Sequence, residues 1–390
     1  MKFLHTSDWH IGRQLHNQSL LDDQAHVLEQ IVALAREHKV DAVVVAGDIY
    51  DRSVPPTTAV DLLNAVLSRL VDELGISVLM IAGNHDSHSR LGFAAAQMES
   101  SGLHIVGPLN DSLEPIVLSG QQGDAAFFLI PYVEPVLVKN VYGDAAADIV
   151  THQDAMAFLL EQVRACDVKG LPKVIVAHCF LDGADESESE RPLSIGGADR
   201  ISPTLFDDFA YAALGHLHGP QYKGAEHIRY SGSILKYSFS EVSQKKSVTL
   251  VDMIDLDESD KAKISLLPLK PIRDLRIVEG MLDDIQLNAA SDVNADDYLM
   301  VRLLDKQAIL DPIGKLRSVY KNVLHLERTG LLAERDEATL TPVNLQQSEM
   351  DMFHSFFEQV TGDTLNEQQQ DVVKTVIEDL YKDLSTGKTQ

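Results

Sequence analysis

The sequence has 390 residues, a formal net charge of −26 and a hydrophobic content of 45%. This length fits two or three domains, and this hydrophobic content is enough for a sizeable core. The negative charge argues against broad, non-specific adhesion to nucleic acid through a basic surface. It does not exclude a phosphate-containing substrate, because bound metal ions can reverse the charge locally.

The cysteine count and the apolar runs narrow the class of protein further. Two cysteines, Cys166 and Cys179, argue against a disulfide scaffold and against a thiolate zinc site. No apolar run reaches the about 18–20 residues of a membrane span. His5 and Asp8 also come too early for the apolar segment of a signal peptide. We therefore expect a soluble cytoplasmic protein that does not associate with membranes.

Strands and helices are expected to alternate along residues 1–270. Valine-rich apolar runs that end at a glycine are typical of strands covered on both faces. The expected strands cover residues 1–7, 40–48, 76–84, 125–133, 173–180, 209–218, 227–234 and 246–253. Apolar residues at helical spacing predict helices at 22–38, 57–74 and near 152–166. The pattern predicts an α/β fold in which two β-sheets form a sandwich flanked by helices.

The character of the chain changes near residue 271. Residues 271–335 are expected to form a small α+β domain in the order strand, strand, helix, strand. Residues 341–390 are expected to be helical, with amphipathic helices at 348–362 and 367–384. Before this change, Asp182 to Glu190 holds five carboxylates in nine residues. We expect this acidic segment to be a solvated, mobile loop that repels DNA.

Five strand ends carry polar side chains. The motifs are DWH with Asp8 and His10, GDIYD with Asp48 and Asp51, GNHD with Asn84, His85 and Asp86, AHC with His178, and GHLH with His216 and His218. Ligands of open α/β sheets bind outside the carboxyl ends of the strands, so these side chains are expected to share one edge. In a strand, residues two apart point to one side, which would direct both histidines of GHLH into one cavity and Leu217 into the core.

Aspartate, histidine and asparagine without cysteine form a ligand set that suits Mn, Fe or Zn. One carboxylate can bridge two cations, and two cations about 3.5–4 Å apart can hold a phosphoryl group and activate a water. Each motif alone could be a solvated turn or, for GHLH, a pair of hydrogen-bonded core histidines. All five in this order favour a dimetal site. A glycine precedes Asp48, Asn84 and His216, where it permits a sharp turn and a close approach.

The motif series resembles the five-motif signature of calcineurin-like metallophosphoesterases. The segments HTSDWHIGR, SERPLSIGGADRI (189–201), YAALGHLHGPQ and IRYSGSILKYSFSE (228–241) are similar to the nuclease branch of this superfamily. That branch contains the nuclease subunits of bacterial DNA-repair complexes. The resemblance implies a metallophosphoesterase domain at 1–270, a DNA-contacting capping domain at 271–335 and a helical tail at 341–390.

The resemblance also implies roles for individual residues. The ligands of one metal ion would be Asp8, His10, Asp48 and His218. Those of the second would be Asp48, Asn84, His178 and His216, with Asp48 bridging the two ions. His85 would be the general acid that protonates the leaving oxygen, a task that suits an imidazole at neutral pH. We expect Asp51 to accept a hydrogen bond from His85 and to steady its charged form, although Asp51 could also be a simple turn residue.

The activity implied by the resemblance is hydrolysis of DNA phosphodiester bonds by a two-metal mechanism with Mn²⁺. It would act as exonuclease and endonuclease on DNA ends and hairpins. The implied partner is an SMC-type ATPase, whose coiled-coil base would bind the tail within a two-plus-two heterotetramer built on a homodimer. The alternative for the two tail helices is that they fold back on their own domain. Association with the nucleoid would follow. The alternatives are a metallophosphoesterase acting on nucleotides, cyclic nucleotides or phosphoproteins, and a catalytically inactive scaffold.

Overall fold

The computed structural model describes residues 1–121, 123–190, 199–253, 261–329, 350, 353–354, 357 and 364–386. The chain divides into two compact units, Met1–Leu275 and Arg276–Gln390. Most of the expected helix at 348–362 and most of the motif at 189–201 fall outside the described residues.

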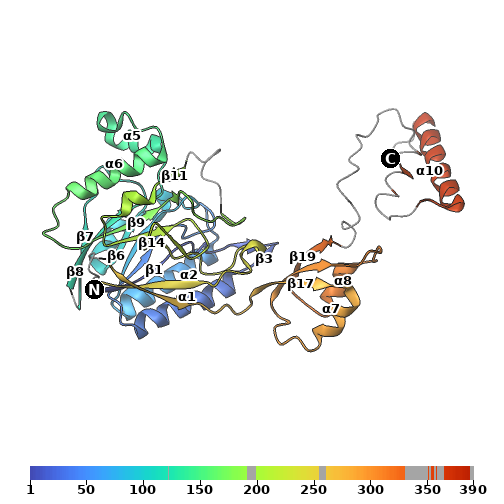
Figure 1. Cartoon of the computed structure of the whole chain (residues 1–390), viewed down its shortest axis with the longest axis horizontal. Helices are drawn as coiled ribbons and strands as arrows, with labels where there is room; N and C mark the ends of the chain where they lie inside the picture. The colour runs from blue at the N-terminus through green and yellow to red at the C-terminus, as the bar shows by residue number, and fades with distance from the viewer. Residues whose placement is uncertain are drawn as a thin grey trace. The chain divides into compact units, whose positions relative to one another are not determined.

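The first unit contains two six-stranded sheets, each with a parallel centre (Figure 1). The first sheet has the order β16-β15-β1-β4-β5-β6, and the second has the order β13-β14-β12-β9-β8-β7. In the first sheet the strands are β1 (Lys2–Thr6), β4 (Ala42–Val45), β5 (Ser77–Ile81), β6 (Leu103–Val106), β15 (Ser247–Asp252) and β16 (Lys263–Pro268). In the second they are β7 (Ile116–Gly120), β8 (Gly123–Ile130), β9 (Lys173–His178), β12 (Tyr211–Gly215), β13 (Gln221–Lys223) and β14 (Ala225–Tyr230).

Helices cover the outer faces of the two sheets (Figure 1). The longer helices are α1 (Leu21–Glu37), α2 (Thr57–Ser68), which continues as a π-helical turn (Arg69–Glu73), α5 (Pro135–Tyr142) and α6 (His152–Ala165). Short elements complete the unit: β2 (Gln14–Leu15), β3 (Gln18–Ser19), α3 (His88–Leu91), α4 (Ala95–Met98), β10 (Phe180–Leu181) and β11 (Arg200–Ile201). The predicted fold class, two sheets flanked by helices, is confirmed.

The period-two pattern of β8 shows how the layers are held together. Phe127 faces the other sheet, where its ring packs edge-to-face on Phe3 at 5.3 Å between centroids. Phe128, one residue on, lies in the separate cluster formed with Leu159 and Val163 of α6. Successive side chains of a strand point to opposite faces, so a fully apolar strand of this kind joins two cores.

The second unit contains a three-stranded sheet of order β17-β18-β19. Its elements are β17 (Leu275–Gly280), α7 (Leu282–Ala289), β18 (Tyr298–Leu303), α8 (Pro312–Arg317) and β19 (Val323–Arg328). The sequence predicted all of these except α7, which buries Leu282, Ile285 and Ala289 on one face. That helix has eight residues, and its N-cap residue, Met281, makes no side-chain hydrogen bond to the helix, so the usual start signal is missing.

The last described element is α10 (Glu367–Thr386), where the sequence predicted a helix at 367–384. Its side chains are described as far as residue 377. Among the helices of the described residues, none is both long enough and apolar enough to span a membrane.

Candidate metal centre

The loops that follow the central strands of both sheets meet at one edge of the sandwich. Main-chain hydrogen bonds join the first two, from Asp8 N–H to Gly47 O at 3.1 Å and from His10 N–H to Asp48 O at 3.0 Å. The carboxylate of Asp8 accepts the main-chain N–H of His216, at 3.0 and 3.2 Å to its two oxygens. The structure therefore brings together all the motif side chains that the sequence predicted to share this edge.

The two histidines of GHLH lie beyond the end of their strand. β12 ends at Gly215, and His216 has a φ of +112°. The prediction that a strand continues to residue 218 is therefore wrong, and strand alternation is not what orients these side chains. Leu217 is nevertheless fully buried in the core, as predicted. A turn with positive φ places both imidazoles at the site.

Asp48 lies between the two groups of histidines. Its Oδ1 accepts the main-chain N–H of His85 at 2.8 Å. Its Oδ2 is 3.6 Å from His10 Nε2 and also 3.6 Å from His178 Nε2. One carboxylate oxygen is thus anchored to the backbone, while the other faces a nitrogen atom on each side.

His178 is held in a single tautomer. Its Nδ1 lies 2.9 Å from the carbonyl oxygen of Ala46, which can only accept a hydrogen bond. Nδ1 therefore carries the hydrogen, and Nε2 presents a lone pair 3.0 Å from Asn84 Oδ1. The ring of His216 stands edge-on to this imidazole, 5.5 Å between centroids. Asn84, His178 and His216 thus form one side of the site.

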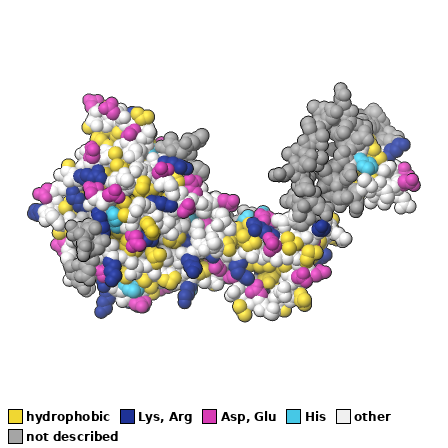
Figure 2. Space-filling model, in the orientation of Figure 1, with side chains coloured by type: hydrophobic (Ala, Val, Ile, Leu, Met, Phe, Trp, Pro, Cys, Tyr) yellow, Lys and Arg dark blue, Asp and Glu magenta, His cyan; other side chains and the backbone are white. Residues whose placement is uncertain are grey.

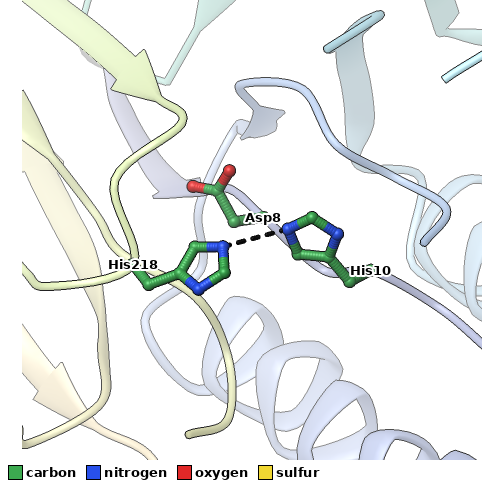
Figure 3. A group of neighbouring side chains, drawn as sticks. All are labelled: Asp8, His10 and His218. Atoms are coloured by element: carbon green, nitrogen blue, oxygen red, sulfur yellow. Dashed lines mark hydrogen bonds between the residues drawn. The ribbon is translucent and has the colours of Figure 1, made fainter. Parts of the chain in front are cut away.

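Asp8, His10 and His218 form the other side (Figure 3). The Nε2 atoms of the two histidines face each other at 3.1 Å. Such a contact accommodates one hydrogen between the two nitrogens, so at least one of them offers a lone pair. The Nδ1 atom of His10 is buried and has no hydrogen-bond partner. It lies 3.8 Å from a carboxylate oxygen of Asp51.

The relation between His85 and Asp51 differs from the prediction. His85 Nδ1 is 2.9 Å from the main-chain carbonyl oxygen of Asp51. The carboxylate of Asp51 instead accepts a hydrogen bond from Arg13 at 3.0 Å. The expected hydrogen bond to the Asp51 side chain is therefore wrong, because the loop turns so that the backbone of this residue, and not its carboxylate, faces His85.

Three buried residues of the site, Asp8, His10 and His216, have strongly shifted pKa values. Burial, and then the charge of Asp48, raise the pKa of Asp8 well above its usual value. Burial, and then neighbouring imidazoles, lower the pKa of His10 and of His216 well below theirs. Carboxylates and neutral imidazoles crowded together away from water need a compensating positive charge. This donor set, together with the orphaned His10 nitrogen, fits divalent metal ions held by oxygen and nitrogen ligands.

Three glycines permit the close contacts between the loops. A Cβ atom on Gly83 would lie 2.2 Å from Asp48 Oδ1, and one on Gly215 would lie 1.8 Å from Ala46 O. Gly47 has a φ of +91°, and its Cβ would lie 2.3 Å from His178 Nδ1. The sequence predicted the need for close approach at these three positions, and the geometry confirms it.

Other residues hold the loops but were not assigned a role from the sequence. Asp86 accepts hydrogen bonds from the main-chain N–H groups of Ile49, Tyr50 and Gly83 at 2.9–3.0 Å. Gln24 is fully buried and donates to the carbonyl oxygens of Trp9 and His10. Asp86 could have been found from its place in GNHD, whereas no sequence signal marks Gln24.

The acidic segment also differs from the prediction at its end. Ser189 is buried, and the carboxylate of Glu190 accepts the main-chain N–H of His218 at 2.8 Å. Ser187 donates hydrogen bonds to the same carboxylate. Residues 182, 183, 185, 186 and 188 are exposed, as expected. The prediction of a fully solvated loop is therefore wrong for residues 189–190, which lie against the site.

The parallel strands of both sheets end at one cluster of histidines and carboxylates. This combination of fold and site is typical of metallophosphoesterases. The family model described as calcineurin-like phosphoesterase matches residues 1–220, and a model described as type 5 capsule protein repressor C-terminal domain matches residues 271–361. SbcD of Staphylococcus epidermidis, which is part of the nuclease SbcCD, is 34% identical over 377 residues, which cover 97% of this chain and 98% of that protein. The chain belongs to the SbcD family of calcineurin-like metallophosphoesterases, which confirms the resemblance.

The solved structures that match include the following two, both of low sequence identity. GAP50, the anchor in the inner membrane complex of Plasmodium, is 12% identical with a TM-score of 0.39. The match covers 84% of this chain and 96% of the GAP50 chain. A dimetal phosphatase from Danio rerio is 13% identical with a TM-score of 0.37 and covers 64% and 92%.

Proposed function

We propose that this metal-dependent phosphoesterase is a DNA nuclease subunit that cleaves phosphodiester bonds at DNA ends and hairpins, as exonuclease and endonuclease, together with the ATPase SbcC. The observation that carries the proposal is the position of Asp48 Oδ2, 3.6 Å from a histidine nitrogen on each side. This arrangement supports two neighbouring cation sites that share one carboxylate. Membership of the SbcD family supports DNA as the substrate.

In the proposed site, Asp8, His10, Asp48 and His218 hold one ion, and Asp48, Asn84, His178 and His216 hold the other. Two divalent ions, which we propose to be Mn²⁺, would activate a water and neutralise charge on the phosphoryl oxygens. The donor set is compatible with Mn²⁺ but does not select it over Fe or Zn.

His85 is the proposed general acid. Because the Asp51 carbonyl can only accept, His85 Nδ1 keeps its hydrogen and Nε2 is the atom that gains and loses a proton. The ring is fixed by this bond and by its edge-on contact with His10, 4.7 Å between centroids. A fixed imidazole can deliver a proton to the leaving oxygen of a phosphodiester.

The remaining proposals concern partners. We propose that residues 271–335 form a capping domain that contacts duplex DNA, that residues 341–390 bind the coiled-coil base of SbcC, and that the chain forms a homodimer within a two-plus-two heterotetramer. The net charge of −26 supports a need for such partners. On the face drawn in Figure 2, acidic and basic side chains of the described residues are interspersed rather than gathered into one basic patch.

A nuclease assay tests the activity. Hairpin, blunt and single-stranded DNA would be incubated with Mn²⁺, with and without SbcC, and a His85→Ala variant would be compared. We expect Mn²⁺-dependent cleavage of DNA that this variant loses. Hydrolysis of bis-p-nitrophenyl phosphate without cleavage of any DNA would instead favour a phosphoesterase of nucleotides or phosphoproteins.

The tail proposal has its own test. Val372 and Val376 of α10 are 63% and 53% exposed and lie one turn apart. The double variant Val372→Asp and Val376→Asp should lose SbcC capture while retaining Mn²⁺-dependent cleavage of single-stranded DNA. Lys374→Asp changes the net charge by the same amount on the opposite side of the helix and is the matched control. Undiminished capture by the double variant would contradict the proposal.

A further inference from the structure

A chain of buried polar side chains lies behind His218. Ser189 closes the acidic segment, Glu241 ends a short 3-10 helix (Phe239–Glu241), and Lys246 precedes β15. Ser189, Glu241 and Lys246 are 8%, 0% and 6% exposed. Burying an ion pair costs solvation free energy on both partners, so a fully buried Glu241 beside a catalytic edge calls for an explanation beyond stability.

His218 is linked to these side chains by a chain of short contacts and by one longer direct contact, 3.4 Å from its Nδ1 to Oε1 of Glu241. His218 Nδ1 lies 2.6 Å from Ser189 Oγ. The hydroxyl of Ser189 in turn donates a short hydrogen bond to Oε1 of Glu241. The other oxygen of Glu241 accepts from Lys246 Nζ at 2.5 Å. Lys246 also donates to the carbonyl oxygen of His218 at 2.8 Å. The relay of Ser189, Glu241 and Lys246 therefore contacts both the ring and the backbone of His218.

The hydrogen-bond donors and acceptors of this relay determine which ring nitrogen of His218 carries a hydrogen. Lys246 supplies donors only, so the ionised carboxylate of Glu241 is an acceptor throughout. Ser189 has a single hydroxyl hydrogen and gives it to Glu241, which leaves its oxygen to accept from His218 Nδ1. Nδ1 then carries the hydrogen, and Nε2 directs its lone pair at His10 Nε2, 3.1 Å away.

The two sides of the site differ in the acceptor that keeps the hydrogen on Nδ1 of the histidine. For His178 the acceptor is the main-chain carbonyl of Ala46, which no substitution removes. For His218 the acceptor is the side chain of Ser189, which is backed by Glu241 and Lys246. A substitution can therefore remove this acceptor. A ligating histidine is oriented and made more basic by the acceptor on its other nitrogen, and loss of that acceptor typically weakens metal affinity about 10–100-fold.

We propose that Ser189 and Glu241 are positioning residues that hold His218 in its Nδ1–H form, with Lys246 keeping Glu241 an acceptor, so that the relay sets the affinity of the ion shared by His10 and His218. This proposal rests on the proposed two-ion site. It assigns the end of the acidic segment a function in metal binding.

The test measures Mn²⁺ binding to the full chain without SbcC, by counting free Mn²⁺ by electron paramagnetic resonance during titration. Ser189→Ala removes the relay hydroxyl but keeps the ion pair of Glu241 and Lys246, and Glu241→Gln removes the charge. We expect both variants to bind one ion at least tenfold more weakly and the other as tightly as the unmodified protein. Asp23→Asn, which breaks the ion pair with Arg273 at 3.0 Å, is the control for loss of a buried carboxylate.

The outcomes separate the two proposals. Two ions bound by Ser189→Ala with unchanged affinities would overturn the relay, as would equal weakening of both ions or equal weakening in Asp23→Asn. If Glu241→Gln does not fold, Ser189→Ala decides alone, with its thermal unfolding in chelator as the check on folding. If the unmodified protein binds a single ion, the two-ion site is wrong, and the relay stands only if Ser189→Ala weakens that ion tenfold.

Discussion

His85 is bound to Asp51 through the main chain: its Nδ1 lies 2.9 Å from the carbonyl oxygen, while the Asp51 carboxylate pairs with Arg13. An acceptor that belongs to the backbone cannot be protonated at any working pH and cannot be removed by substitution. The imidazole therefore keeps one fixed hydrogen, and the other nitrogen is available for proton transfer.

His85→Ala should lower turnover on DNA by about 10²–10⁴-fold, the usual contribution of a general acid. Turnover of bis-p-nitrophenyl phosphate should fall much less, because p-nitrophenolate leaves without being protonated. Steady-state kinetics on both substrates measure the difference. Equal losses on the two substrates would contradict a general-acid role, and Mn²⁺ titration would then show whether the variant had lost metal instead.

Asp51→Asn should have a milder effect than His85→Ala. The substitution leaves the carbonyl that orients His85 and removes the negative charge that lies 3.0 Å from the guanidinium of Arg13 and 3.8 Å from Nδ1 of His10. We expect less than a tenfold loss of turnover at normal Mn²⁺ occupancy, measured side by side with His85→Ala. A loss as large as that of His85→Ala would mean that the carboxylate acts in the reaction.

Gly83→Ala should disrupt the site, because its Cβ would lie 2.2 Å from the carboxylate of Asp48 and 2.3 Å from its main-chain nitrogen. Overpacking of this kind typically costs about 1–3 kcal/mol of unfolding free energy. Displacement of Asp48 should also reduce Mn²⁺ affinity. Gly280→Ala is the control, since its nearest contact would be an ordinary 3.4 Å. Denaturant unfolding and Mn²⁺ titration of both variants test this, and equal behaviour would refute it.

Removal of divalent ions should lower the unfolding temperature. Ions that bind only the folded chain stabilise it by about 2.7 kcal/mol at a concentration one hundred times the dissociation constant. Thermal unfolding in Mn²⁺ and in chelator gives the shift, and His10→Ala should reduce it. The same unfolding temperature under both conditions would argue against metal binding at this edge.

Acid should destabilise the first unit through His5. This residue is fully buried, with contacts to Tyr211 OH at 2.9 Å and Leu214 O at 3.1 Å. Burial lowers the pKa of His5 from 6.5 to about 3. Between these values the unfolded chain binds a proton that the folded chain does not, so stability falls as the pH drops below 6.5.

At pH 4.5 the difference is on the order of 2 kcal/mol. Urea unfolding at pH 7 and pH 4.5 measures it, and His5→Asn should lose less stability than the unmodified chain over this interval. Equal losses in the two proteins would show that other groups dominate acid unfolding.

The layers of the fold and the motif side chains of the site could be predicted because both depend on local pattern. Valine-rich runs that end in glycine are specific enough to mark buried parallel strands, and polar residues after them must share an edge. The pattern predicted the sandwich, and it predicted correctly that Asp8, Asp48 and His178 converge.

The rest depends on contacts between distant segments or on backbone direction. Gln24 supports the His10 loop from a helix 14 residues away, and no motif announces such a contact. The residue at which β12 ends and the direction of the Asp51 carbonyl both depend on the backbone angles φ and ψ. The residue types at these positions do not determine those angles. The short helix α7 lacks a cap, so only packing reveals it.

Four residues at this edge adopt left-handed backbone conformations: Asp8 at +51°, His10 at +44°, Asp48 at +50° and His216 at +112°. Each conformation costs a residue with a side chain on the order of 1 kcal/mol, which glycine would be spared. Glycine would relieve this backbone strain, but at Asp8 and Asp48 it would also remove the carboxylates that accept the main-chain N–H groups of His216 and His85. If aspartate and histidine persist at these torsions in related proteins, their persistence would indicate selection for metal binding, because the torsions themselves cost folding free energy.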